Sequence, residues 1–246
     1  MDRLIYSAVS GMNASMVRER MIASNMANAQ TIGFKAEVLR AETVTLDGPQ
    51  LEVRAMNRSE VKGASMKDGA VIPTGNPLDV AMTGKIMLAV QSVDGQEGYT
   101  RRGDLSVSPT GVIQNGEGLP VLGEGGPLMV PPGAQVSIGE DGAVLMRDPA
   151  VPEQEPQRID RLKLVNTAGS ALEKDLAGVF RVPGGGVLPV DAEAKVIPES
   201  LEQSNVNTSQ VLVDMIEAQR LFDLRTKLVQ TAKELDEGST RLMRLD

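Results

Sequence analysis

The fold of this chain is decided by a Pro-free stretch at residues 3–28, which reads RLIYSAVSGMNASMVRERMIASNMAN and whose single Gly is Gly11. Its apolar residues recur at heptad distances in two rows, the first of which is interrupted by Glu19. One row holds Ile5, Met12 and Met26, and the other holds Val9, Met16 and Ala23. A period of about 3.5 to 3.6 residues predicts an amphipathic helix.

A second Pro-free stretch lies at residues 207–245 and has Gly238 as its only Gly. Asn207 is placed to cap a helix, with Gln210 three residues later in the capping-box position. The apolar rows are Leu221, Leu228, Leu235 and Leu242; Val211, Ala218 and Ala232, interrupted by Arg225; and Met215, Phe222 and Val229. This spacing predicts a second amphipathic helix.

The middle of the chain, residues 30–200, has a different amino-acid composition and contains all 14 Pro. Short alternating apolar runs, such as residues 78–82 and 86–90, stand between Gly and Pro turn signals. Residues 136–146 predict a hairpin around Glu-Asp-Gly, and residues 180–187 predict a turn between strands at Gly-Gly-Gly. Regular short strands with such turns indicate an antiparallel β domain.

The two predicted helices are expected to pair, because an isolated amphipathic helix is marginal in water. We therefore predict an α+β fold, with paired N- and C-terminal helices in a coiled-coil-like arrangement flanking a central antiparallel β-rich domain. The expected contacts join Leu4, Ile5, Val9, Met12 and Met16 to Leu221, Leu228 and Leu235. Two ordinary surface helices on one globular domain are the alternative, but the confinement of both helices to the ends of the sequence favours pairing.

Composition excludes several classes of function. The 246 residues include no Cys and no His, which removes Cys/His zinc sites, disulfides, and Ser-His-Asp or Cys-His catalysis. The net charge is −8 and no basic stripe is present, so a nucleic-acid partner is not expected. No run approaches the ~18 apolar residues of a membrane span, and residues 1–21 lack the apolar centre of a cleaved signal. With 2 Tyr, 3 Phe and no Trp, the core should be aliphatic.

Residues 23–35 read ASNMANAQTIGFK. This stretch resembles the signature A-N-N-x-A-N-x-x-T-x-G-F-K of bacterial flagellar basal-body rod proteins, with Ser24 in place of the first Asn. Further similar motifs, in the family's order, are TGNPLDV at 74–80, YTRRGDL at 99–105, GLPVLG at 118–123 and LEQSNV at 201–206. This chain departs from the family at Leu105, where the family has Phe, and at Ile86 and Met87, where it has an aromatic pair.

The first motif also has a physical interpretation. Asn25 and Asn28 lie near the predicted helix end, where Asn tolerates a left-handed backbone and bonds its own main chain. Gly33 supplies a free φ for a turn. Phe34, one of few aromatic residues, is expected to anchor the segment that follows.

The resemblance implies a structural rod subunit, and residues 1–6 are similar to those of proximal-rod members. Such a subunit is made in the cytoplasm, leaves through the flagellar type III export apparatus without a cleaved signal, and lies in the rod that crosses the periplasm. Its partners are copies of itself and other rod subunits. The implied assembly interface comprises Leu4, Ile5, Val9, Met12, Met16, Asn25, Asn28, Gly33, Phe34, Ser204, Asn205, Val206, Val211, Ala218, Leu221, Phe222, Leu228 and Leu235.

The resemblance also implies a division of the chain. Residues 1–30 with 205–246 would form the terminal-helix assembly domain, D0. Residues 31–73 with 186–204 would be extended connecting segments. Residues 74–185 would form the β-rich outer domain, D1.

Two other classes of function stay open at this point. A cell-wall glycosidase could use carboxylate pairs such as Glu153 with Glu155, or Asp191 with Glu193, but these lie in polar, Pro-flanked loops where solvated side chains are the norm. A secreted β-rich binding module with helical stalks is the other. The Gly clusters at 123–126 and 184–186 precede no Lys-Ser/Thr pair and predict turns, not phosphate cradles. We expect no catalytic residue, no cofactor and no metal.

Overall fold

A computed structural model describes residues 2–45, 55–131, 133–147, 155–175 and 178–243. The chain forms two units. The helical unit comprises Met1–Ala27, Glu37–Gly63 and Asn207–Asp246, and the β unit comprises Asn28–Ala36 and Ala64–Val206. The described residues therefore confirm an α+β fold with one helix toward each end and an antiparallel β-rich region between them.

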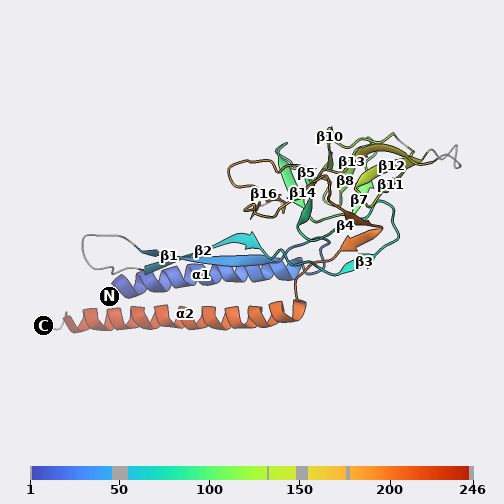
Figure 1. Ribbon diagram of the computed structural model, residues 1–246. Helices are drawn as coiled ribbons and strands as arrows, with labels where there is room; N and C mark the ends of the chain where they lie inside the picture. Colours follow the sequence, from blue (N-terminus) through green and yellow to red (C-terminus); the bar gives the residue numbers. More distant parts are fainter. Residues whose placement is uncertain (1, 46–54, 132, 148–154, 176–177, 244–246) are drawn as a thin grey trace. The chain divides into compact units, whose positions relative to one another are not determined.

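The helical unit consists of α1 (Asp2–Ala27), α2 (Thr208–Met243) and a hairpin of β1 (Glu37–Thr45) with β2 (Ala55–Ala64). Within this unit α1 and α2 run in opposite directions, and α1 lies between α2 and the hairpin (Figure 1). Asn207 caps α2 as predicted, because its Oδ1 accepts from the Gln210 backbone N–H at 3.1 Å. The Gln210 side chain, however, donates to Asp214 at 3.0 Å.

The β unit contains strands β3 to β18. Their bounds are β3 (Val71–Pro73), β4 (Val80–Met82), β5 (Ile86–Gln91), β6 (Glu97–Thr100), β7 (Leu105–Val107), β8 (Ile113–Asn115), β9 (Leu122–Gly123), β10 (Gly126–Pro127), β11 (Gln135–Ile138), β12 (Ala143–Arg147), β13 (Gln157–Arg161), β14 (Leu164–Asn166), β15 (Glu173–Lys174), β16 (Phe180–Arg181), β17 (Val196–Pro198) and β18 (Ser200–Glu202). The largest sheet has the order β14-β5-β6-β16-β15, and a second has the order β11-β12-β13. The remaining strands of this unit pair in twos: β7 with β8, β9 with β10, β4 with β17 and β3 with β18.

Strand β5 lies at the centre of the β unit's core. Its alternating sequence predicts one buried face, but both faces are covered. Leu88 and Val90 belong to the larger aliphatic cluster, whereas Met87 and Ala89 belong to a second cluster with Tyr99. The Tyr99 hydroxyl accepts from the Leu188 backbone N–H at 2.6 Å, which satisfies the buried phenol.

Two turn predictions have different outcomes. The hairpin at residues 136–146 is confirmed, since Val136 pairs with Met146 and Ile138 pairs with Val144. The Gly184–Gly186 segment is a turn, with the Gly185 N–H bonded to the Val182 carbonyl at 3.1 Å. The chain after it is not a strand at Val187, so the second half of that predicted strand pair is wrong.

The segments expected to be extended connectors, residues 31–73 and 186–204, carry more structure than their sequence indicates. They contain β1, β2 and β3 on one side and β17 and β18 on the other. Neither helix, over its described length, has an apolar stretch long enough to cross a membrane.

Candidate functional site

Asn25, on α1, fixes the start of the hairpin within the helical unit. Its Oδ1 accepts from the Glu37 N–H at 2.8 Å, and its Nδ2 donates to the Glu37 carbonyl at 3.1 Å. The amide thus pairs with β1 as a neighbouring strand would, and Asn25 is only 7% exposed. Neither Asn25 nor Asn28 adopts the left-handed backbone that Asn tolerates: Glu199 is the one non-Gly residue with positive φ in the described chain. Helix α1 continues through Ala27, so Asn25 is helical.

In the β unit, Gly33 lies where the segment after α1 meets the segment before α2. Its N–H donates to the Glu202 carbonyl at 2.7 Å, and its φ is 67°. A Cβ on Gly33 would collide with the backbone of Arg101 and Arg102. Glycine is therefore required here twice, for the left-handed conformation and for the close approach of two backbones. Beside it, the Lys174 ammonium lies 3.8 Å from the centroid of the Phe34 ring.

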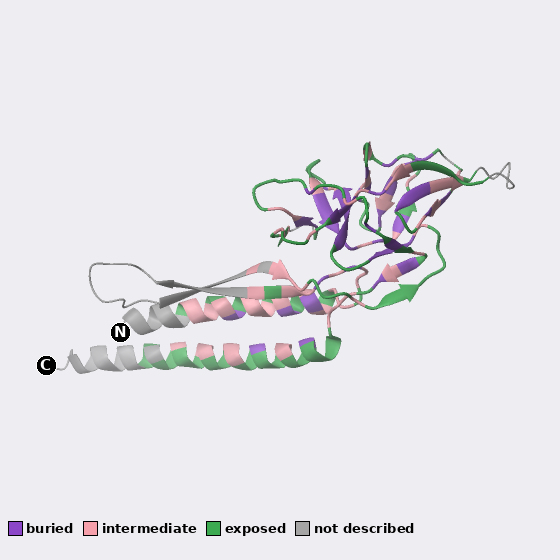
Figure 2. Cartoon of the chain, in the orientation of Figure 1, coloured by how far each residue is buried: buried purple, intermediate pink, exposed green. Residues whose placement is uncertain are grey.

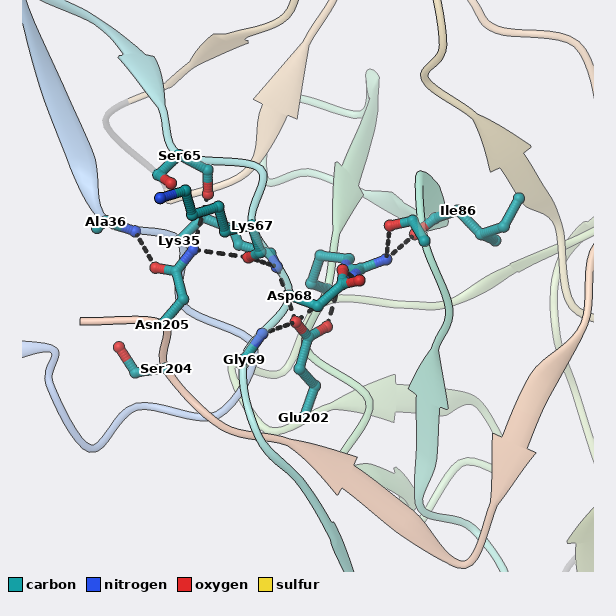
Figure 3. A network of polar contacts seen from close by, with 12 residues as sticks. Lys35, Ala36, Ser65, Lys67, Asp68, Gly69, Ile86, Glu202, Ser204 and Asn205 are labelled. Carbon is teal, nitrogen blue, oxygen red and sulfur yellow. Dashed lines mark hydrogen bonds and ion pairs between the residues drawn. The ribbon is translucent and has the colours of Figure 1, made fainter. Parts of the chain in front are cut away.

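A buried ionic junction joins three of the sequence motifs that lie far apart along the chain (Figure 3). Lys35 Nζ donates to Glu202 Oε1 at 2.7 Å, and Arg101 Nε lies 2.8 Å from Glu202 Oε2. These three side chains are 1–2% exposed. Arg101 Nε and Glu202 Oε2 form no hydrogen bond with each other, but Arg101 Nη2 donates to Glu202 Oε1 at 3.4 Å.

The same junction satisfies its remaining donors with backbone oxygens and one further acid. Arg101 Nη1 donates to the Gly84 and Ile86 carbonyls at 2.8 and 2.7 Å, and Nη2 pairs with Asp68 at 2.5 Å. Lys35 Nζ also donates to the Lys67 carbonyl at 2.7 Å. Burial is the main cause that lowers the pKa of Lys35, and the hydrogen bond to Glu202 opposes it. The charges balance only while Glu202 stands between the two cations.

Asn205 makes a second set of long-range hydrogen bonds next to the ionic junction. Its Oδ1 accepts from the Ala36 N–H at 2.7 Å, and its Nδ2 donates to the Ser65 and Lys67 carbonyls, both at 2.8 Å. Its own N–H reaches the Phe34 carbonyl at 3.3 Å. Three groups of this residue therefore make four hydrogen bonds, two to the segment that follows α1 and two to the segment that follows β2.

Helix α2 turns a different apolar row toward α1 than predicted. On this row Val211 and Ala218 are 8% and 2% exposed, and Arg225 Nη1 donates to the Gly11 carbonyl and the Ser15 hydroxyl of α1. Leu228 is 66% exposed, so the expectation that it packs against α1 within one chain is wrong. The companion row, with its small Ala and its Arg, faces inward because the guanidinium finds acceptors on α1.

Both helices consequently present apolar side chains outward. On α1, Val9 is 43% and Met16 is 51% exposed. On α2 the exposed set is Leu212, Val213, Ile216, Leu224 and Leu228, which we call the outer face of α2. Figure 2 shows buried residues concentrated on the strands of the β unit, whereas the described part of α2 is mostly exposed or half-buried.

The remaining predicted residues fall into two groups. Met12, Asn28, Phe34, Ser204, Val206, Leu221 and Phe222 are half-buried. The side chains of Leu4, Ile5 and Leu235 lie outside the described residues. The sequence prediction missed Lys35, Arg101, Glu202, Ser15 and Arg225. The first three are the charged residues inside motifs that were quoted for other reasons, and their opposite signs were the available signal.

Three stretches of the chain match families of flagellar proteins. Residues 5–35 match the flagella basal body rod protein family, residues 81–146 match the flagellar hook protein FlgE/F/G D1 domain, and residues 197–242 match the flagellar basal body rod FlgEFG protein C-terminal family. The ionic junction draws on all three stretches, through Lys35, Arg101 and Glu202.

Curated relatives match over nearly the whole length. The flagellar basal-body rod protein FlgF of Salmonella typhimurium is 35% identical over 249 residues, which is 99% of each chain. FlgF of Escherichia coli is 37% identical over 95% of each chain. The flagellar basal-body rod protein FlgG of Bacillus subtilis is 28% identical, covering 99% of this chain and 100% of its own.

Proposed function

Because this chain belongs to the family of flagellar basal-body rod proteins, and is FlgF-like within it, we propose that it is a proximal-rod subunit that assembles through its terminal helices and transmits torque. The observation that carries the proposal is the outer face of α2. Its five large apolar residues are 45–66% exposed in the single chain. Fully burying an exposed side chain of this kind contributes about 1.5–3 kcal/mol, and about half of each side chain is still exposed, so association that covers this face is favoured.

The proposed partners are copies of this chain and other rod subunits. Val9 and Met16 on α1 extend the exposed apolar surface to the second helix of the same unit. In this role the two helices pair in a coiled-coil-like manner and form the assembly domain D0. The domain division into 1–30 with 205–246, 31–73 with 186–204, and 74–185 follows the same proposal.

Torque must pass between the terminal helices and the β-rich region through the two segments that connect them. Those segments are pinned to each other and to β5 by the ionic junction of Lys35, Arg101 and Glu202 and by the four bonds of Asn205. A buried network of paired charges is rigid, and removing any one member is strongly destabilising because it leaves an uncompensated buried charge. In the proposal, torque is therefore transmitted through this junction.

Export through the flagellar type III apparatus, without a cleaved signal, and a place in the part of the rod that crosses the periplasm belong to the same proposal. Amphipathic helices that are stabilised only by packing present a low barrier to passage as an unfolded chain, and the cost of ordering them falls at assembly.

A non-catalytic role is part of the proposal. Of the carboxylates considered for a glycosidase, Asp191 and Glu193 form a local turn in which Asp191 Oδ1 accepts from the Glu193 N–H at 3.0 Å. Glu155 is exposed, and Glu153 lies outside the described residues. A family of rod proteins is a structural family, which agrees with this role.

The test is Leu228→Asp in a strain whose only copy of the gene carries the change. A carboxylate on the outer face of α2 should stop rod completion, because a charge cannot be buried unpaired at a subunit contact. Electron microscopy of isolated basal bodies would then show truncated rods. The matched control is Val93→Asp, an 89% exposed apolar residue in a turn of the β unit, which should leave rods complete. Complete rods with Leu228→Asp would refute the proposal.

A further inference from the structure

Arg225 is a charged residue on the apolar row of α2 that faces α1. The row's other described members, Val211 and Ala218, are buried, so a guanidinium here interrupts an otherwise apolar seam. Polar residues at such positions of paired helices lower stability but specify how the helices align. Arg225 is tolerated at this position because α1 supplies acceptors for its guanidinium.

The acceptors on α1 form a socket made of one glycine and one serine. Arg225 Nη1 donates to the Gly11 carbonyl and to the Ser15 hydroxyl, which lies one turn further along the same face. Gly11 is the only Gly in α1, and a Cβ there would lie 3.6 Å from Arg225 Nε. The guanidinium therefore rests directly on backbone that a larger side chain would cover. Ser15 is 3% exposed, so its hydroxyl depends on this partner.

No neighbouring register offers that socket. The heptad rows repeat, so sliding α2 by seven residues, about 10 Å, keeps apolar residues opposite one another. One slide would place Arg225 against Arg18 and Ile22, which bring a like charge and no side-chain acceptor. The opposite slide would place it against Leu4 and Ala8, neither of which has a polar side chain.

We propose that Arg225 is the register-determining residue of the terminal helix pair, with Gly11 and Ser15 as its socket. By fixing the register it decides which apolar residues of α1 and α2 lie together on the outward surface that other subunits would contact. The inference rests on the proposed function for the importance of that surface, but the register itself is a property of the single chain and can be measured without assembly.

The chain has no Cys, so two spin labels can be attached at Arg20→Cys on α1 and Gln230→Cys on α2 in the full-length protein. Both residues are exposed, and they lie on opposite sides of the Arg225 contact along the antiparallel pair. Sliding α2 along α1 by seven residues therefore changes the distance between the two spin labels by nearly the whole translation of about 10 Å. Pulsed electron paramagnetic resonance should give one distance for the parent protein.

Arg225→Leu should keep the helical content in circular dichroism and add a second distance displaced by about 10 Å. Arg225→Lys, which keeps a donor, should restore the parent distance as the main one. The control Arg220→Leu changes an exposed residue of α2 and should leave the single distance unchanged. A single parent distance in Arg225→Leu at unchanged helical content would overturn the proposal.

If Arg225→Leu lost its helical content, a variant that moves the guanidinium to another position on α2 tests the register instead. Arg225→Ala combined with Ala218→Arg carries the guanidinium one heptad earlier, so the pair should shift its main distance by about 10 Å to return the charge to Gly11 and Ser15. A pair that kept the parent distance, or failed to form, would overturn the inference. Complete rods with Leu228→Asp would instead refute the proposed function and leave the register result standing.

Discussion

The β unit and the helical unit treat apolar side chains in opposite ways. In the β unit, Leu88, Val90 and Val144 are completely buried within one chain. In the helical unit, Leu224 and Leu228 are 59% and 66% exposed, although α2 already packs on α1. The difference teaches that one unit completes its core alone, whereas the other carries an apolar surface that a single chain does not cover.

The two units also use charged side chains differently. The β unit concentrates two cations and two carboxylates, Glu202 and Asp68, in one balanced junction that fixes chain segments to each other. The helical unit places one cation, Arg225, on backbone and hydroxyl oxygens of α1. The first arrangement secures a fold, and the second selects one alignment among several similar ones.

The largest effect is expected where the β unit's charge balance is broken. Glu202→Gln leaves Lys35 and Arg101 as buried cations without their shared anion and should lower the free energy of unfolding by about 3–5 kcal/mol. Urea unfolding followed by circular dichroism measures this. Glu117→Gln is the control, since Glu117 forms a partly exposed 3.4 Å pair with Arg102 and should cost at most about 1 kcal/mol. Equal losses in the two variants would show that the junction is not special.

The contrast between the units can be tested with one substitution made in each. Leu88→Ala in β5 should cost about 3 kcal/mol of stability, since it opens a cavity in a closed core. Leu228→Ala on the outer face of α2 should change the stability of the free subunit by no more than about 0.5 kcal/mol. If the two variants lost similar free energies of unfolding in the same urea titration, the contrast between a core closed within one chain and an apolar surface left exposed would be contradicted.

Alkaline pH should weaken the β unit through Tyr99. Burial raises the pKa of Tyr99 to about 12, against about 10 in the unfolded chain. The neutral phenol therefore contributes stability that is fully present below pH about 10 and is lost as the pH rises toward 12. Two pKa units correspond to roughly 2–3 kcal/mol. Unfolding midpoints between pH 9 and 12 should fall less steeply for Tyr99→Phe than for the parent, and parallel curves would contradict this.

The smallest effect is expected in the helical unit, at the contact of α1 with β1. Asn25→Ala removes both bonds to Glu37 and should cost about 1 kcal/mol. The loss should be local, so hydrogen exchange at the Glu37 amide is the sensitive measurement. Asn13→Ala, at an exposed position of α1, should leave that amide protected. Unchanged exchange in Asn25→Ala would mean that the hairpin is held by other contacts.

Sequence reasoning predicted the elements whose signals are local. The two helices follow from heptad spacing, the α2 start from Asn207, and the hairpin at 136–146 from its Glu-Asp-Gly turn. It could not predict which row of α2 faces inward, because Leu228 fits an apolar seam better than Arg225 does on hydrophobicity alone. That choice depends on the Gly11 and Ser15 oxygens of another helix, which no local pattern reports.

The ionic junction escaped prediction for a related reason. Lys35, Arg101 and Glu202 are separated by 66 and 101 positions, and in the sequence each reads as an ordinary solvated charge. The pairing of the Asn25 side chain with β1 could not be predicted from the sequence either, since its partner is the backbone of Glu37. Long-range polar contacts of this kind become visible only once the strands are placed.

The central claim is that the outer face of α2 is covered when the rod assembles, and maleimide labelling tests it most directly. Leu228→Cys introduces the only thiol in the chain, and it should react readily in the purified subunit but at least tenfold more slowly in isolated basal bodies. Val93→Cys, in the β unit, should react at similar rates in both. Equal labelling of Leu228→Cys in free subunits and in assembled rods would contradict the account.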